Sequence, residues 1–301
     1  MSLRIAITGA TGLIGSKLIP YFYSEGHQVT QITRQASLKG ASAPLITWDP
    51  DAGKMDEARL EGFDVVVHLA GANVGQYWTP SHKQQILDSR VNGTRLLCTT
   101  LAGLKHKPKV LLAASAVGYY GNHAPDISLD EQSPKGHGFL AEVCEAWERE
   151  TRIAVKAGIR VVNMRFGVVL SKKGGALAKM NVPFQLGLGG VLGTGKQMIS
   201  WIALDEIPSI MMHVINVDIA GAVNAVSPNA VSNKEFTKIL GEVIKRPTVF
   251  PVPALGVKLL FGEMGEEMLL QGSRVEPERL QNTNYRFHYP DLRSALMKAM
   301  K

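Results

Sequence analysis

Residues 3–15 read LRIAITGATGLIG, an apolar segment that runs directly into a glycine-rich turn. The segment from Leu3 to Thr8 predicts a buried strand, and the residues after the turn predict a helix. Gly9 can take a backbone conformation closed to other residues, Gly12 leaves room for a pyrophosphate, and Gly15 lets the helix pack on the strand. With a second apolar strand ending near residue 33, these residues predict a dinucleotide-binding unit whose helix start faces the phosphates.

The second predicted strand, Val29 to Thr33, ends at Arg34 rather than at an acidic residue. A site for NAD usually carries Asp or Glu here, because a carboxylate accepts from the ribose 2′-hydroxyl and repels a 2′-phosphate. The hydroxyl of Thr33 and the guanidinium of Arg34 suit a phosphate instead. We therefore expect NADP(H) as the cofactor. The alternative is an arginine that is merely solvated at a strand end.

Composition indicates a globular protein with a large core, since 45% of the 301 residues are apolar and 20% are charged. No run of 18 or more uncharged apolar residues occurs and no signal peptide is recognised, so we expect a cytoplasmic protein without a membrane span. Cys98 and Cys144 are the only cysteines, and neither lies in a CxxC pair. This argues against a disulfide framework and against zinc, and no metal site is predicted.

The net charge is +7, a value that would suit nucleic-acid binding if the basic residues were clustered. They are scattered, and the densest group, residues 105–109, has no interleaved aromatic side chains. We therefore expect no nucleic-acid partner. The positive charge instead favours an anionic cofactor or small-molecule substrate through electrostatic steering.

Apolar strands and amphipathic helices continue to alternate after Arg34. Further strands are predicted at Leu45 to Trp48, Val65 to Leu69, Val110 to Ala114 and Arg160 to Arg165, with helices near Ser81 to Leu101 and Gly138 to Lys156. The unbroken apolar runs are typical of strands covered on both faces. The pattern predicts an α/β fold, a Rossmann-type doubly wound parallel sheet. We assign residues 1–170 to the cofactor domain, open to completion by later segments, and residues 171–301 to a smaller carboxy-terminal substrate lobe.

Several segments together resemble the extended and atypical short-chain dehydrogenase/reductases, the superfamily that includes nucleoside-diphosphate-sugar epimerases. They are GATGLIG at 9–15, HLAG at 68–71, SAVGYYG at 115–121 and RFGVV at 165–169. GLGG at 187–190, WIALDE at 201–206 and the tail from Pro228 to Leu296 look like one branch, the epimerase-family proteins with a distinctive carboxy-terminal domain. The resemblance covers essentially the whole chain.

The resemblance implies a set of cofactor contacts at the glycine turn and at the ends of the following strands. These residues are Gly9, Thr11, Gly12, Leu13, Ile14, Thr33, Arg34, Leu69, Ala70, Gly71, Arg90 and Val169. Arg90 stands where related enzymes carry an asparagine. A guanidinium at this position is able to clamp a phosphate or a substrate carboxylate.

Enzymes of this superfamily use a Tyr near the nicotinamide, a Lys four residues later on the same helix, and a Ser that binds the reacting oxygen. The corresponding helix offers Phe139 with Val143, or Leu140 with Cys144, and neither pair can perform this chemistry. The candidate catalytic residues that remain follow the fifth strand: Ser115, Tyr119 and Tyr120. Each has a structural alternative, a helix cap for the serine and packing with a satisfied hydroxyl for the tyrosines.

Two functions are compatible with these residues. The first is an NADP(H)-dependent oxidoreductase or epimerase-like enzyme for a small polar substrate, a class in which we include nucleotide-linked molecules. The second is an NADP(H)-binding regulatory protein that has lost the redox chemistry. The missing Tyr and Lys favour the second function, whereas the complete glycine turn and the large substrate lobe favour the first. We favour the enzyme, and the sequence predicts neither the substrate nor the oligomeric state.

Overall fold

A computed structural model describes residues 2–34 and 43–301. Its centre is an eight-stranded sheet in the order β12-β8-β6-β5-β1-β2-β3-β4. The strands are β1 (Arg4–Thr8), β2 (Gln28–Thr33), β3 (Leu45–Asp49), β4 (Lys54–Met55), β5 (Val65–His68), β6 (Val110–Ala116), β8 (Arg160–Phe166) and β12 (Gly221–Ala225). All neighbouring pairs are parallel except β3 with β4. This confirms the predicted Rossmann-type sheet.

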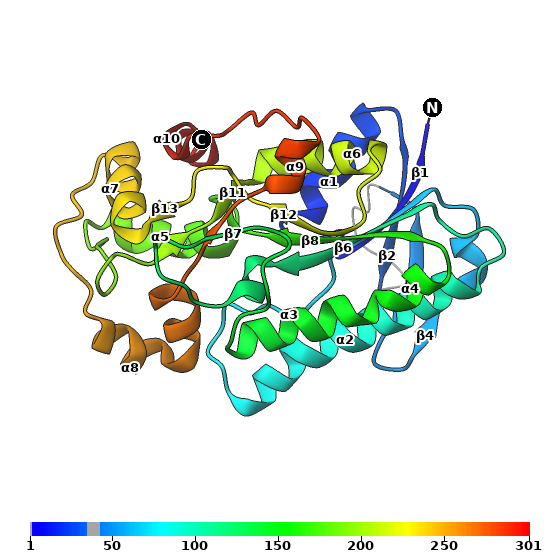
Figure 1. Cartoon of the computed structure of the whole chain (residues 1–301), viewed down its shortest axis with the longest axis horizontal. Helices are drawn as coiled ribbons and strands as arrows, with labels where there is room; N and C mark the ends of the chain where they lie inside the picture. The colour runs from blue at the N-terminus through cyan, green and yellow to red at the C-terminus, as the bar shows by residue number, and fades with distance from the viewer. Residues whose placement is uncertain (1, 35–42) are drawn as a thin grey trace.

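Helices cover both faces of the sheet (Figure 1). On one face lie α1 (Gly15–Ser24) and α6 (Ile207–Asn216), and on the other α2 (Pro80–Gly103), α3 (Phe139–Glu150) and α4 (Arg152–Lys156). Alternate strand residues serve the two layers, because side chains along a strand point to opposite faces. Ile5 and Ile7 belong to the core beneath α1, whereas Ala6 packs with the core beneath α2.

The sequence predicted one helix from Gly138 to Lys156, and the structure divides this segment into α3 and α4 at Thr151. The sheet is also completed from beyond residue 170, since β12 pairs with β8 along its whole length and α6 packs beside α1. One strand of the sheet therefore comes from residues well beyond the segment from which the fold was predicted. No helix in the described ranges is long and apolar enough to cross a membrane.

The second lobe lies beyond the carboxyl ends of the strands, on the left of Figure 1. Its elements are β7 (Ser128–Leu129), β9 (Val168–Leu170), α5 (Gly175–Gln185), β10 (Met198–Ile199), β11 (Trp201–Ala203), β13 (Val231–Ser232), α7 (Asn233–Ile244), α8 (Ala254–Gly265), the π-helical turn η4 (Glu266–Leu270), β14 (Arg274–Val275) and α10 (Leu292–Ala299). The short helix α9 (Glu278–Asn282) instead packs against β12 of the large sheet (Figure 1). Short 3-10 turns are η1 (Glu57–Leu60), η2 (Val117–Tyr120) and η3 (Leu204–Glu206). Trp201 and Phe236 lie at the centre of this lobe's own core.

Candidate functional site

The glycine turn lies where the strand order reverses, between β1 and its neighbours β2 and β5. Gly9 has a φ of +66°, and a Cβ atom there would lie 2.8 Å from the carbonyl carbon of Leu69. A Cβ atom on Gly15 would lie 2.4 Å from the carbonyl oxygen of Gly9. Only glycine fits these two positions without a shift of the backbone. The turn is thereby packed against the loop after β5, while Gly12 stays exposed at its tip.

Three buried side chains connect the carboxyl ends of the strands β1 and β5 with the middle of the helix α2. The hydroxyl oxygen of Thr8 lies 2.7 Å from Nδ1 of His68, and Nε2 of His68 lies 2.9 Å from the hydroxyl oxygen of Thr94. The same Thr8 oxygen accepts hydrogen bonds from the backbone N–H groups of Leu69 and Ala70. Burial, with a smaller effect of Arg90, lowers the pKa of His68 to about 4. The imidazole is therefore a neutral structural link at the switch point of the sheet.

The other residues predicted to contact the cofactor lie along the same edge. A Cβ atom on Gly174 would lie 3.4 Å from the Leu13 side chain, and one on Gly175 would lie 3.6 Å from the carbonyl oxygen of Val169. The guanidinium of the half-buried Arg90 lies against Gly71 and donates hydrogen bonds to the carbonyl oxygens of Ala72 and Ile86. Arg90 therefore stabilises the loop after β5 through this hydrogen bond to Ala72.

At the end of β2, Thr33 is half-buried and Arg34 is exposed. Gln35, which follows Arg34, lies outside the described residues. The arrangement fits a dinucleotide on two counts. Gly9 and Gly15 pack against backbone so closely that the turn presents the exposed Gly12 at its tip, where a phosphate can approach the main chain, and the first turn of α1 carries no acidic residue to oppose a phosphate.

Ser115 lies in a buried polar network rather than in an open site. Its hydroxyl donates a 2.6 Å hydrogen bond to Oε1 of Glu148 on α3. The guanidinium of Arg165, on β8, holds both carboxylate oxygens of Glu148, at 2.8 and 2.9 Å. A bidentate pair of this kind is strong and fixes both partners. Ser115 is therefore fully engaged in bonding between the sheet and α3.

The two tyrosines of η2 meet different surroundings. Tyr120 is fully buried. Its hydroxyl accepts a hydrogen bond from Nη1 of Arg165 at 2.9 Å and donates one to Oδ1 of Asn224 at 2.7 Å. Burial raises the pKa of Tyr120 to about 12. Tyr119 is half-buried, its ring lies 3.5 Å beneath the Arg165 guanidinium, and none of residues 2–34 and 43–301 hydrogen-bonds to its hydroxyl. The geometry thus separates a bonded packing residue from one whose hydroxyl is uncommitted.

Leu140 and Cys144 occupy the first two turns of α3 and form one of the two pairs at which the superfamily resemblance implies Tyr and Lys, the other being Phe139 and Val143. The Leu140 side chain lies against Gly118, at 3.1 Å from a Cβ atom built there. Burial, reinforced by the nearby Glu148, raises the pKa of Cys144 to about 11. A buried neutral thiol cannot supply the positive charge of the missing lysine.

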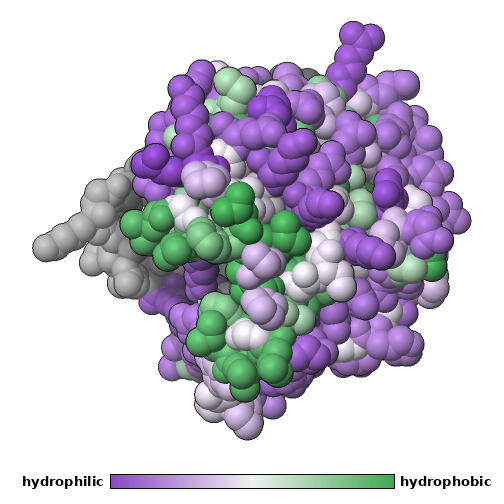
Figure 2. All heavy atoms as spheres, turned by 90° about the vertical axis from the view of Figure 1, so that its left-hand side faces the viewer, coloured by the Kyte–Doolittle hydropathy of each residue, from purple (hydrophilic) through white to green (hydrophobic). Residues whose placement is uncertain are grey.

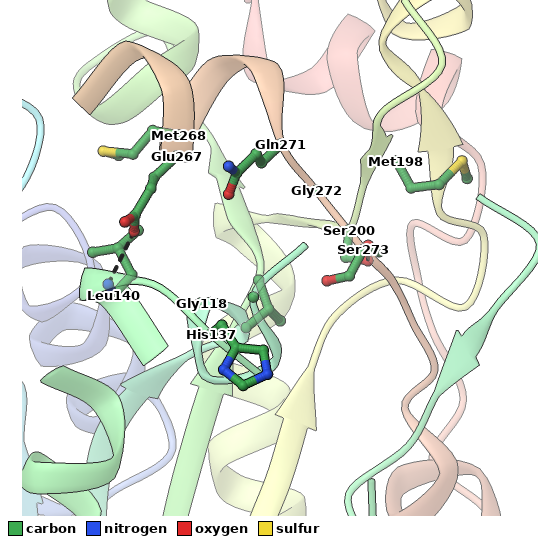
Figure 3. Close-up of a pocket in the computed structure, with 12 residues that line it drawn as sticks. Gly118, His137, Leu140, Met198, Ser200, Glu267, Met268, Gln271, Gly272 and Ser273 are labelled. Atoms are coloured by element: carbon green, nitrogen blue, oxygen red, sulfur yellow. Dashed lines mark hydrogen bonds between the residues drawn. The ribbon is translucent and has the colours of Figure 1, made fainter. Parts of the chain in front are cut away.

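A pocket opens directly beside Leu140, between η2, the start of α3 and the second lobe (Figure 3). Its polar side chains are His137, Ser200, Glu267, Gln271 and Ser273, and its apolar ones include Leu140, Met198 and Met268. None of the lining residues is Lys or Arg. The pocket therefore offers hydrogen-bonding groups within a largely apolar lining, but it lacks the side chains that usually bind a diphosphate.

Glu267 connects the two lobes across this pocket. Its carboxylate accepts hydrogen bonds from the backbone N–H groups of Phe139 at 2.8 Å and of Leu140 at 3.0 Å, the latter drawn in Figure 3. It thereby caps the first turn of α3, where unpaired amides and the helix dipole favour a negative charge. The cap comes from η4, so the position of the second lobe determines one wall of the pocket.

Three residues that line the pocket were not predicted from the sequence: His137, Glu267 and Gln271. His137 and Gly138 immediately precede α3, so a search for residues at the start of that helix would have found the histidine. Glu267 has no local signal, because its partners lie more than 120 residues earlier in the chain. The same holds for Glu148, an ordinary helical glutamate until the fold places Ser115 and Arg165 beside it.

Comparison with known families now gives this arrangement a context. The model of the NAD dependent epimerase/dehydratase family matches residues 5–225, and that of a domain of unknown function, DUF1731, matches residues 252–299. The chain belongs to the NAD-dependent epimerase/dehydratase family. The match confirms the resemblance found in the sequence, and the second model covers α8 to α10 of the distinctive carboxy-terminal region.

Relatives within the epimerase family span nearly the whole chain. An epimerase family protein of Mycobacterium bovis is 40% identical over 294 residues, covering 97% of this chain and 96% of its own. The human epimerase family protein SDR39U1 is 32% identical over 301 residues and covers 98% of both chains. The family relationship therefore holds for both lobes together.

Solved structures agree with this assignment. A crystal structure of human SDR39U1 with NADPH has a TM-score of 0.89 and 32% identity, covering 99% of this chain and all of that one. A nucleoside-diphosphate sugar epimerase of Corynebacterium glutamicum has a TM-score of 0.80 and 35% identity, covering 98% of this chain and 57% of that one. A UDP-glucose 4-epimerase of Thermus thermophilus, at 16% identity and a TM-score of 0.78, shares the fold.

Proposed function

We propose that this epimerase-family protein is an NADP(H)-dependent oxidoreductase or epimerase-like enzyme acting on a small polar substrate. One observation carries the proposal: the pocket lies against Gly118 and Leu140, beside the helix that carries the catalytic Tyr in the superfamily it resembles. A substrate held there would meet the nicotinamide end of a dinucleotide bound along the ends of β1, β5 and β6.

Three features support NADP(H) as the cofactor. The glycine turn fits a pyrophosphate, and β2 ends at Thr33 and Arg34 without a carboxylate to oppose a 2′-phosphate. The similar human protein is crystallised with NADPH. The bound nicotinamide would supply or accept a hydride. The protein's residues would hold its phosphates at Thr11 to Ile14, its 2′-phosphate at Arg34 and its ribose near Gly71 and Arg90.

The pocket supports a substrate whose reacting part is polar and uncharged. Hydrogen-bonding groups are plentiful, yet the one carboxylate, Glu267, is already bonded to the amides of α3 and would repel an anion. A carbonyl or hydroxyl group suits His137 and Gln271, which both project into the space shown in Figure 3. A nucleotide portion, if present, would extend beyond the pocket.

Proton transfer needs a group other than the absent helical tyrosine. Tyr120 and Ser115 are bonded within the buried network, so the proposal assigns them to the support of the site. The hydroxyl of Tyr119 is uncommitted, and the imidazole of His137 lies in the pocket. We assign the proton donor to one of these two groups.

The test is a screen of NADPH oxidation against carbonyl compounds, with sugar nucleotides as a second panel assayed for epimerisation. Turnover at a rate that saturates with substrate, and that is lost when Leu140 is replaced by Trp to fill the pocket, is the expected result. Unchanged NADPH binding by Leu140→Trp is the control for a folded cofactor site. Tight NADPH binding with no turnover in either panel would contradict the enzyme and favour the regulatory function.

A further inference from the structure

The second lobe exposes an unusual amount of apolar side chain on one side of the molecule. Fifteen large apolar side chains are exposed in the described ranges, and ten of these lie between residues 182 and 268. Figure 2 views this side and shows apolar residues gathered over it. The apolar face, as we call it, comprises Leu186, Leu188, Phe250, Leu255, Leu259, Leu260 and their apolar neighbours in this range.

Backbone contacts hold the parts of the apolar face side by side. Gly190 lies against the carbonyl oxygen of Phe250, and Leu192 forms a parallel bridge with Val252. Nε of Arg246 donates to the carbonyl oxygen of Gln185 at the end of α5. The end of α5 and the segment leading into α8 therefore form one surface rather than separate exposed residues.

The outer side of α8 is apolar where a surface helix is normally polar. Leu255 and Leu259 lie one turn apart and are 69% and 76% exposed, and Leu260 is 71% exposed. A helix that is apolar all round is normally covered by another surface. At these exposures the ten side chains amount to on the order of 1,000 Å², against the few hundred Å² of the largest patch on a typical monomer.

The charged side chains beside this face distinguish between two possible occupants, an anionic membrane surface and a second copy of the chain. Nζ of Lys258 lies 2.7 Å from Oε1 of Glu266, and Nζ of Lys83 lies 2.7 Å from Oε1 of Glu263. An anionic membrane surface favours unpaired basic residues, and both Lys258 and Lys83 have a carboxylate partner. A patch that carries both signs of charge is instead able to pair with an identical patch across a twofold axis.

We propose that the apolar face is the interface of a homodimer, with a second copy of this chain as its occupant. The apolar area matches the roughly 800 Å² that each partner contributes to a standard interface. Met268 belongs to the face and also lines the pocket. The second copy therefore lies beside the pocket, and dimer formation covers one of its edges.

The experiment is sedimentation velocity of the full chain from nanomolar to high micromolar concentration. The expected result is a dimer for the unmodified protein, with self-association weakened roughly 100-fold or more by Leu259→Glu, because a twofold interface repeats the change. Leu255→Glu is a second variant with the same expectation. Both positions are largely exposed, so thermal unfolding should stay close to that of the unmodified protein.

Val155→Glu is the matched control, because Val155 is an exposed apolar residue of α4, is 54% exposed and lies outside the apolar face. This variant should remain dimeric. A protein that is monomeric at every concentration, or a dimer that persists in both Leu→Glu variants, would overturn the proposal. Monomeric protein that floats with phosphatidylserine vesicles, and stops doing so with Leu259→Glu, would also overturn it and identify a membrane as the occupant.

Discussion

The hydroxyl of Thr8 is directed at Nδ1 of His68, and this one hydrogen bond joins the strands on either side of the switch point. The direction follows from the other partners of Thr8. Its oxygen already accepts from the N–H groups of Leu69 and Ala70, so its own proton is left for the imidazole. Nε2 of His68 must then carry the ring proton and donate it to Thr94. The bond is possible only while the imidazole is neutral.

This bond predicts a pH dependence of stability. Burial lowers the pKa of His68 to about 4, below its value of about 6.5 in the unfolded chain. The unfolded state therefore binds more protons between these values. The contribution of His68 to the free energy of unfolding is complete above pH 6.5. It decreases, by up to about 1.4 kcal/mol per pH unit, as the pH falls towards 4. Urea unfolding between pH 7 and pH 4.5 measures the slope.

His68→Gln should be less stable than the unmodified protein at pH 7, and the difference should narrow as the pH falls. His137→Gln is the control, because it removes an exposed imidazole that takes no part in the hydrogen bonds of His68 with Thr8 and Thr94. Parallel curves for His68→Gln and the unmodified protein would show that His68 does not produce the dependence.

Arg34 determines the second prediction, a preference for NADPH over NADH. Arg34→Ala should weaken NADPH binding by about 1.5–3 kcal/mol, the range for a hydrogen bond to a charged group, and should leave NADH binding nearly unchanged. Titration of the intrinsic fluorescence with each cofactor measures both affinities. Arg152→Ala, at an exposed position of α4, is the control for lost positive charge. An equal loss for both cofactors would remove Arg34 from the 2′-phosphate site.

The third prediction is that two substitutions in the glycine turn have different effects, one on NADPH binding and the other on stability. Gly12 is exposed, so Gly12→Val should abolish NADPH binding in a protein that unfolds at nearly the normal temperature. Gly15→Ala should instead lower stability by about 1–3 kcal/mol, because its Cβ atom would lie 2.4 Å from the Gly9 oxygen and force a backbone shift. Calorimetry and fluorescence titration of both variants test this. NADPH affinity retained by a folded Gly12→Val protein would place the cofactor elsewhere.

Local patterns were sufficient to predict the six inner strands of the sheet. The apolar runs at Val65 to Leu69 and Val110 to Ala114 mark strands covered on both faces, and the structure confirms both as central strands. The edge strand β12 was not predicted. It has five residues, includes Gly221 and the buried polar Asn224, and follows a segment already assigned to the second lobe. Its hydrogen bonds to β8 come from a long-range contact that no local pattern records.

Only those parts of the candidate site that are formed by contiguous residues could be predicted from the sequence. The glycine turn is a contiguous motif, so its position at the switch point followed from the sequence. Glu267 and Glu148 act through partners elsewhere in the chain, and the isolated sequence does not distinguish them from solvated glutamates. The same limit applied to Tyr119 and Tyr120, which are adjacent in sequence and differ only after the fold places Asn224 beside one hydroxyl.

That difference gives the last prediction. Tyr120→Phe leaves Nη1 of Arg165 and Oδ1 of Asn224 without the hydroxyl that each of them bonds, so it should destabilise the protein by about 1–3 kcal/mol and leave NADPH affinity unchanged. Ser115→Ala should behave similarly, since it removes the donor to Glu148. In contrast, one of Tyr119→Phe and His137→Gln should lower kcat by about 100- to 10,000-fold with little change in stability, because the group lost would be a positioned proton donor.

Each variant therefore needs two measurements, the free energy of unfolding in urea and kcat with a substrate found by the screen. A loss of stability without a matching loss of kcat in Tyr120→Phe would confirm a packing role. A large loss of kcat in that variant, with stability retained, would restore Tyr120 as the donor and contradict its assignment to the buried network. Full activity in both Tyr119→Phe and His137→Gln would exclude both proposed donors. The proton would then have to come from water or from the substrate itself, because the hydroxyls of Ser115 and Tyr120 are already bonded within the protein.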